Sequence, residues 1–326
     1  MTSLAGVNPN SLDDRAAMGL PAQLVERFAP DAYARHAELL GRPAAALLTV
    51  LADPDAALER RYVAGTALAM LGDPRIRPLD PAMVTIPAAR TEIGLAASEV
   101  DAVTQRWRHA GVQRDWISKE CPAHRVALAE FRIMRWPVTN VAYRQFLAET
   151  QHAELPTSWR FGGYPHLRAN HPVWTVRPAD AEHYARWLSA RTGRAFRLPT
   201  EAEWEHAAHG GTGAEYPWGE DFHADAANTV EAGPLSTTPV GMYPHGRSVT
   251  GAEDLAGNVE EFVADNYRPY PGGAEIADDL TIGRDGYRVA RGGSFTRFGD
   301  LARCRRRHGW FDRAIYAMGF RLAETP

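Results

Sequence analysis

The sequence predicts an α+β fold with little regular secondary structure, preceded by a small all-α segment. Residues 1–78 are rich in Ala, Leu and Arg and carry short helical patterns of apolar residues. Strand-like patterns follow, together with many Gly, Pro, Asn and Asp residues. A chain of 326 residues has room for one large or two ordinary domains. We therefore divide it into a helical N-terminal segment of short helix pairs, residues 1–78, and a second domain, residues 79–326.

Charge and cysteine content exclude several classes of protein. The chain has 36 Lys and Arg residues against 40 Asp and Glu residues, so nucleic acid and anionic membranes are not expected partners. Its longest apolar run, residues 44–52, is far shorter than the ~18 residues of a membrane span. No signal-peptide pattern opens the sequence, and we expect a cytoplasmic protein. Two cysteines, Cys121 and Cys304, are too few for a four-cysteine zinc site.

Proline marks the start of each helix expected in the N-terminal segment. Pro30, Pro43 and Pro54 precede Ala- and Leu-rich stretches, and proline suits the first turn of a helix. Gly72 lies where the last of these helices would be capped, and Pro74 prevents its continuation. We expect short antiparallel helices that serve packing or docking to a protein partner.

Strand patterns appear after residue 80. Residues 82–89 (AMVTIPAA) predict a short strand, and residues 124–134 (HRVALAEFRIM) alternate imperfectly, as one half-buried strand would. Residues 96–120 predict a helical or looping insertion between them.

Three later helices carry recognisable start signals. Thr139 predicts a capped helix through residue 149, and Pro178 predicts a second helix that ends at Gly193. The strongest signal is Thr200 followed by Glu203, a capping box in which each side chain bonds the other residue's backbone amide. Beyond residue 210, the scarcity of periodic segments predicts a loop-rich region.

Eight ordered motifs make the chain resemble the formylglycine-generating enzyme, or sulfatase-modifying factor, family. They are WPVTNVAYRQFL, HPVWTVRPADAEHYARWL, FRLPTEAEWEHAAHGG, YPWG, NTVEAG with TTPVG, DLAGNVEEFVAD, RVARGGSF and MGFRLA. The resemblance covers about residues 80–326 and implies a C-type-lectin-like fold. Members of this family include copper oxidases that make formylglycine, iron-dependent sulfoxide synthases, siderophore-maturation enzymes and non-catalytic variable binding proteins.

The residues that hold copper in such oxidases are missing here. The resemblance places the first thiolate at Arg297 and the second within residues 299–302, where no cysteine stands. Cys304 follows too late, and we interpret it as a small buried residue. The iron-dependent members use an N-terminal histidine pattern, whereas His36 is the single histidine of this N-terminal segment. Iron or copper is thus possible but unsupported by the usual ligands.

A separate metal interpretation concerns histidines on the helix predicted after Thr200. His206 and His209 are three residues apart and therefore share a helix face. We favour solvent-facing or capping roles for both and keep a transition-metal site as the weaker alternative.

The resemblance also implies calcium. By position its ligands would be the Asp254 and Glu261 carboxylates and the Gly257 and Val259 carbonyls, oxygen donors of the kind that Ca²⁺ prefers. A turn capped by its own amides is the alternative. A second calcium site would begin at Asn228, but the stretch that should complete it is shortened, which makes that site doubtful.

Arginines and aromatic residues are interleaved between residues 297 and 316. They could bind a peptide or small anionic ligand through bidentate hydrogen bonds and stacking, or they could form structural ion pairs. We expect structural roles for Arg303 and Arg307. The pocket candidates are Ser294, Arg297, Arg305, His308, Trp310 and Glu260, the last of which replaces the family's usual Trp.

Two functions remain open. One is a metal-dependent oxidoreductase that acts without the cysteine pair, for which no catalytic residue is assigned. The other is a non-catalytic recognition module of C-type-lectin-like fold that binds a peptide or small anionic ligand.

Overall fold

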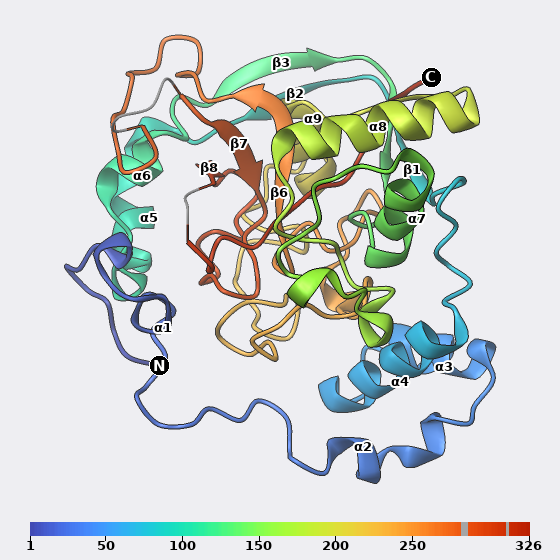
Figure 1. Cartoon of the computed structure of the whole chain (residues 1–326). Helices are drawn as coiled ribbons and strands as arrows, with labels where there is room; N and C mark the ends of the chain where they lie inside the picture. Colours follow the sequence, from blue (N-terminus) through green and yellow to red (C-terminus); the bar gives the residue numbers. More distant parts are fainter. Residues whose placement is uncertain (282–285, 311–312) are drawn as a thin grey trace.

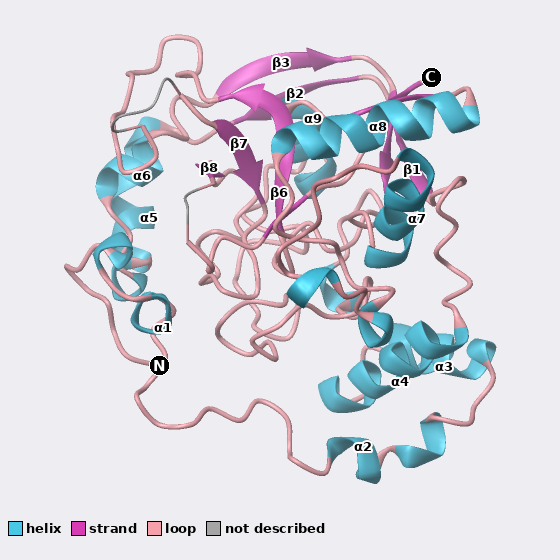
Figure 2. Cartoon of the chain, in the orientation of Figure 1, coloured by secondary structure: helices cyan, strands magenta, loops and turns pink. Residues whose placement is uncertain are grey.

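The computed structural model describes residues 1–281, 286–310 and 313–326. Long loops connect short helices and strands through the middle of the molecule (Figures 1 and 2). The helices are α1 (Asp14–Ala17), α2 (Ala32–Arg35), α3 (Ala44–Ala52), α4 (Leu58–Leu71), α5 (Val100–Arg106), α6 (Arg114–Ser118), α7 (Asn140–Thr150), α8 (Pro178–Thr192) and α9 (Glu201–His209). Within the described ranges, no helix is long and apolar enough to cross a membrane.

Three small sheets accompany these helices. The first has the order β1-β4-β10-β5, the second pairs β2 with β3, and the third has the order β8-β7-β6-β9. The strands are β1 (Met83–Ile86), β2 (Ala89–Ile93), β3 (His124–Leu128), β4 (Phe131–Met134), β5 (Ala195–Arg197), β6 (Glu260–Asn266), β7 (Arg288–Arg291), β8 (His308–Gly309), β9 (Met318–Gly319) and β10 (Ala323–Thr325). The predicted mixed α+β fold with limited regular structure is confirmed.

The N-terminal segment consists of two separate parts, not of one stack of helices. α2, α3 and α4 lie together at one corner, whereas α1 lies beside α5 (Figure 1). Leu4 packs in a cluster with Trp107, and its amide donates to the His109 carbonyl at 2.7 Å. The first twenty residues therefore pack against the larger domain. Their sequence gives no periodic pattern that would show this.

Local signals placed most helices correctly. Thr200 and Glu203 form both bonds of the capping box, and Gly210 ends α9 at φ 60°. Thr139 precedes α7 as expected but makes no side-chain capping bond, so that part of the prediction was wrong.

The stretch expected as one strand forms two. β3 pairs with β2 and β4 with β1, so residues 124–134 supply neighbouring strands to different sheets. The pattern breaks at Ala129 and Glu130, where the alternation in the sequence was already imperfect.

Arginine–carboxylate pairs are buried throughout the core. The guanidinium of Arg291 lies 2.9 Å from Glu201 and 2.8 Å from Glu205, and Arg321 lies 2.6 Å from Glu261. A buried charge without a partner is very costly, so each pair fixes the relative position of the segments that carry it. The structural roles expected for Arg303 and Arg307 are confirmed. Both are at most 2% exposed and bonded to glutamates.

Replacing a buried arginine should destabilise the fold far more than replacing an exposed one. Arg303→Met takes from the buried Glu120 its closest cation and leaves Glu215 with Arg305 alone, and we expect a loss of about 3–5 kcal/mol in unfolding free energy. Arg114→Met, the control, removes an exposed pair with Asp101 and should cost at most about 1 kcal/mol. Urea denaturation of both variants checks the difference, and equal losses would contradict it.

Candidate functional site

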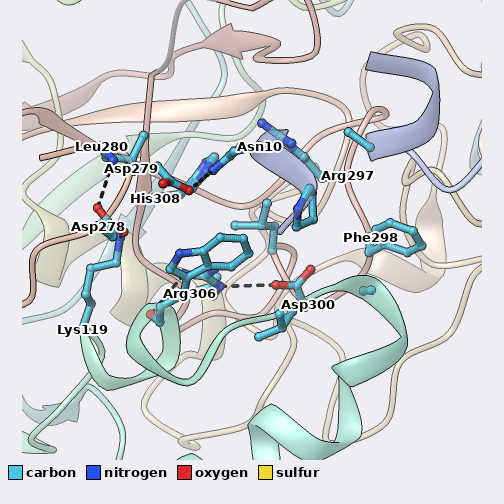
Figure 3. A pocket seen from close by; sticks show the side chains of 16 residues that line it. Asn10, Lys119, Asp278, Asp279, Leu280, Arg297, Phe298, Asp300, Arg306 and His308 are labelled. Carbon is cyan, nitrogen blue, oxygen red and sulfur yellow. Dashed lines mark hydrogen bonds and ion pairs between the residues drawn. The ribbon is translucent and has the colours of Figure 1, made fainter. Parts of the chain in front are cut away.

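A cavity lies between the N-terminal residues, the α5–α6 region and the loop around residue 300 (Figure 3). Its volume is about 40 Å³. The described residues that line it are Pro9, Asn10, Ala17, Ala110, Val112, Trp116, Lys119, Asp278, Asp279, Leu280, Arg297, Phe298, Asp300, Leu301, Arg306 and His308. Two of the predicted pocket residues, Arg297 and His308, are therefore brought together.

Glu260 contacts both of these residues. It begins β6 and is fully buried, and its carboxylate oxygens lie 2.5 Å from His308 Nδ1 and 3.4 Å from Arg297 Nε. β7 lies between β6 and β8, so the third sheet holds Glu260 and His308 in a fixed relation. The charged residue that replaces the family's usual Trp is thus the buried partner of the two cavity residues.

Burial and charge set the protonation of this pair. Burial lowers the pKa of His308, although the Glu260 carboxylate acts in the opposite direction. Burial also opposes ionisation of Glu260, but His308 and Arg297 together lower the pKa of that carboxyl. A neutral His308 that donates from Nδ1 to Glu260 keeps Nε2 as a proton acceptor. This arrangement is that of a general base oriented by a carboxylate.

Arg297 has an unused donor. Its guanidinium carbon lies 4.1 Å from the centre of the Tyr316 ring, which fixes the side chain by a cation–π contact. Nη2 is buried and, within the part of the chain that the structure describes, meets no hydrogen-bond acceptor. Because an unsatisfied buried donor is costly, a ligand carboxylate or other anion in the cavity would relieve that cost.

The N-terminal residues complete one wall of the site. Asn10 accepts a hydrogen bond from Tyr316 at 3.0 Å and donates one to Asp279 at 2.7 Å. Arg313 anchors the same segment through Asp14 at 2.7 Å. Sequence reasoning missed this wall because its contacts span about 300 positions in the chain.

Lys119, the single lysine of the sequence, also lines the cavity. It forms an ion pair with Asp278, and burial lowers the pKa of its amine to about 8. Its amine also lies 5.4 Å from the centre of the Tyr287 ring. Its isolation in an arginine-rich sequence was the signal that could have singled it out.

Three other predicted pocket residues lie elsewhere. Ser294 is buried and bonds Thr296 at 2.9 Å, and Arg305 turns away to Glu215 at 3.4 Å. Trp310 is 44% exposed and lines a neighbouring cavity that also contacts Tyr316. The expected cluster is thus divided between the cavity, the core and an adjacent surface.

The predicted calcium ligands lie on a tight loop, residues 254–259, and at Glu261 of β6. Asp254 and Gly257 both have positive φ, and the Asp254 carboxylate accepts from the Gly241 amide at 2.6 Å. The Glu261 carboxylate is already engaged by Arg321 at 2.6 Å and by Trp204 at 2.9 Å, while Val259 is fully buried. The loop thus makes the tight turn that a calcium site needs. A cation, however, would have to share the Glu261 oxygens with Arg321.

The doubtful second calcium position has one feature in its favour. Asn228 is buried, and its Oδ1 meets no hydrogen donor among the described residues. A cation would satisfy this oxygen. A Cβ on Gly233 would, however, lie 2.0 Å from the same atom, so space beside it is narrow.

The alternative metal residues are buried. Neither His206 nor His209 faces solvent, which corrects the solvent-facing half of the role we favoured, and burial lowers the pKa of His209 to about 4. His209 does accept from the Gly211 amide just beyond α9. Among residues 1–281, 286–310 and 313–326, no group of three His, Cys, Asp or Glu side chains is arranged to hold a metal ion.

Comparison with known sequences identifies several relatives, among them a hercynine oxygenase and a formylglycine-generating enzyme. The hercynine oxygenase of Mycobacterium tuberculosis is 35% identical over 213 residues, which cover 55% of this chain and 48% of that protein. The formylglycine-generating enzyme of Streptomyces coelicolor is 33% identical over 233 residues, which cover 54% of this chain and 71% of that enzyme. The chain thus spans about half the length of the hercynine oxygenase.

Solved structures agree with the fold. PvdO from Pseudomonas aeruginosa has a TM-score of 0.59 at 28% identity, with 76% of this chain and 95% of PvdO covered. Treponema denticola variable protein 1 has a TM-score of 0.55 at 22% identity, with 75% of this chain and 95% of that chain covered, and supports the fold alone. Residues 71–326 match the family described as the sulfatase-modifying factor enzyme 1-like domain. With its motifs, relatives and C-type-lectin-like fold in agreement, the chain belongs to this formylglycine-generating-enzyme-like family.

Proposed function

We propose that the chain is an oxidoreductase of this family that binds the carboxylate of a small substrate at the cavity. One observation carries the proposal: Arg297, whose buried Nη2 has no acceptor among the described residues, lines the same cavity as His308, whose partner is Glu260. An anion-binding donor and a proton acceptor thus share one small space. This pair of groups suits a substrate that is held by its carboxylate and loses or gains a proton nearby.

The relatives support both the reaction class and the substrate class. Hercynine, on which the hercynine oxygenases act by name, is a betaine of histidine and carries a carboxylate. It therefore matches the donor that Arg297 offers. Because the chain spans about half of the M. tuberculosis enzyme, we propose hercynine as the first substrate to test rather than as an assigned one.

Three residues of the chain would have separate roles in binding and proton transfer. Arg297 would hold the carboxylate, Glu260 would keep His308 oriented, and His308 Nε2 would accept or return a proton. Iron or copper is the redox metal to test, but the described residues offer no set of three ligands for it. We assign these residues binding and proton transfer and assign no ligand to a redox metal.

Removing the Arg297 donor should weaken substrate binding. In isothermal titration with hercynine, we expect Arg297→Met to lower affinity at least about tenfold, since a charged hydrogen bond contributes about 1.5–3 kcal/mol. Arg305→Met is the matched control, because Arg305 belongs to the same loop but bonds Glu215. Equal affinities for the wild type and both variants would contradict the assignment.

Oxygen uptake separates the enzyme from a recognition module. The expected result is oxygen consumption that requires both hercynine and the purified protein when Fe(II) or Cu(I) is supplied, above the consumption by the metal alone. Binding of hercynine without oxygen consumption with either metal would contradict the proposal of an oxidoreductase and favour the non-catalytic alternative.

The Glu260–His308 pair predicts a specific titration. Because burial lowers the pKa of His308, we expect the imidazole to be neutral at pH 7 and to titrate below the usual value of about 6.5. Glu260→Gln removes the carboxylate that raises this pKa, so the titration should move to still lower pH. Histidine NMR measures both, with Glu182→Gln as a control remote from the pair. A wild-type value at or above about 6.5 would contradict the assignment.

Calcium at the Asp254 loop is also a proposal. The loop geometry supports it, whereas the engagement of Glu261 by Arg321 weighs against it. We expect calcium to raise the melting temperature, because a ligand that binds the folded state stabilises it. Asp254→Ala should abolish that shift and Asp101→Ala, which removes an exposed carboxylate, should leave it intact. A calcium-independent melt of the wild type would overturn the proposal.

A further inference from the structure

An arginine-rich groove lies apart from the candidate site. It has a volume of about 660 Å³ and is open to solvent, and among the described residues it shares none of its lining with the cavity around Arg297. Five of its lining residues are arginines, contributed by the segment before β1, by β4 and the residue after it, by the turn before β5 and by the loop near residue 247. They are Arg77, Arg132, Arg135, Arg194 and Arg247.

Two nearly buried carboxylates position four of these arginines. Glu324, with a side chain 3% exposed, accepts from Arg132 at 2.7 Å and from Arg194 at 2.6 Å. Glu253, with a side chain 4% exposed, does the same for Arg135 and Arg247, each at 2.6 Å. The guanidinium groups are therefore held in place before any ligand arrives.

The groove has more positive than negative charge. Asp80, which pairs with Arg77 at 2.8 Å, is the acid on its lining, and Glu253 and Glu324 are its two nearly buried acids. Five arginines against these three carboxylates leave a balance of two positive charges. Since a guanidinium has five N–H donors and each ion pair uses part of them, donors remain for an anion at the open face.

We propose that this groove binds a small dianion, either a phosphate monoester or a dicarboxylate. Planar arginine forks recognise phosphate and carboxylate oxygens in pairs, which a set of fixed guanidinium groups favours. The volume lies within the usual range of about 300–1,000 Å³ for small-molecule sites. The site differs in position and residues from the proposed substrate cavity, so its test does not depend on that function.

The experiment titrates the full chain with inorganic phosphate and, separately, with succinate at constant ionic strength. We expect saturable binding of at least one dianion and a loss of at least about tenfold in affinity for the double variant Arg77→Gln, Arg247→Gln. These two side chains are 64% and 46% exposed, so the fold should tolerate their replacement.

The control double variant Arg90→Gln, Arg114→Gln removes the same charge from exposed positions outside the groove. It should bind as the wild type does. An equal loss in the control would show a general charge effect and overturn the site, as would the absence of saturable binding by both dianions. Tighter binding of phosphate or of succinate then distinguishes the two ligand classes.

Discussion

The buried pairing of arginine with glutamate is the interaction on which the rest of this structure depends. Regular secondary structure is sparse, and loops of the C-terminal third are held against α9 and the sheets by charged bonds. Glu201, at the start of α9, binds both Arg291 and Arg307, while Arg321 joins Glu261 of β6 to the C-terminal segment. A buried charge that loses its partner is very unfavourable, so these bonds permit few alternative arrangements of the loops.

The candidate site uses the same pairing of arginine with carboxylate, but among the described residues Nη2 of its arginine, Arg297, has no acceptor. Arg297 has a carboxylate neighbour in Glu260, but that carboxylate is shared with His308. In the core, by contrast, Arg303 bonds two glutamates, and the difference separates a structural arginine from one with a donor to spare. In the open groove, the nearly buried carboxylates of Glu253 and Glu324 each pair with two arginines, so the arginines outnumber these acids.

Sequence reasoning succeeded where short-range chemistry decides the outcome. The capping box at Thr200 and the glycine after α9 depend on neighbouring residues, and the ordered motifs identified the fold. It failed where distant segments meet. Asn10 reaches Tyr316 across 306 positions, and no local pattern could place it in the cavity wall. Ser294 and Arg305 lie near Arg297 in sequence, yet loop geometry turns them into the core and toward Glu215.

The central claim is that Arg297, supported by Glu260 and His308, forms a binding site for a carboxylate-bearing substrate. The most direct measurement is a crystal structure of the protein with bound hercynine. The account predicts the ligand at the cavity, with a carboxylate oxygen at hydrogen-bonding distance from Arg297 Nη2 and the imidazole of His308 still paired with Glu260. Hercynine bound at another surface, with Arg297 Nη2 still unsatisfied, would contradict it.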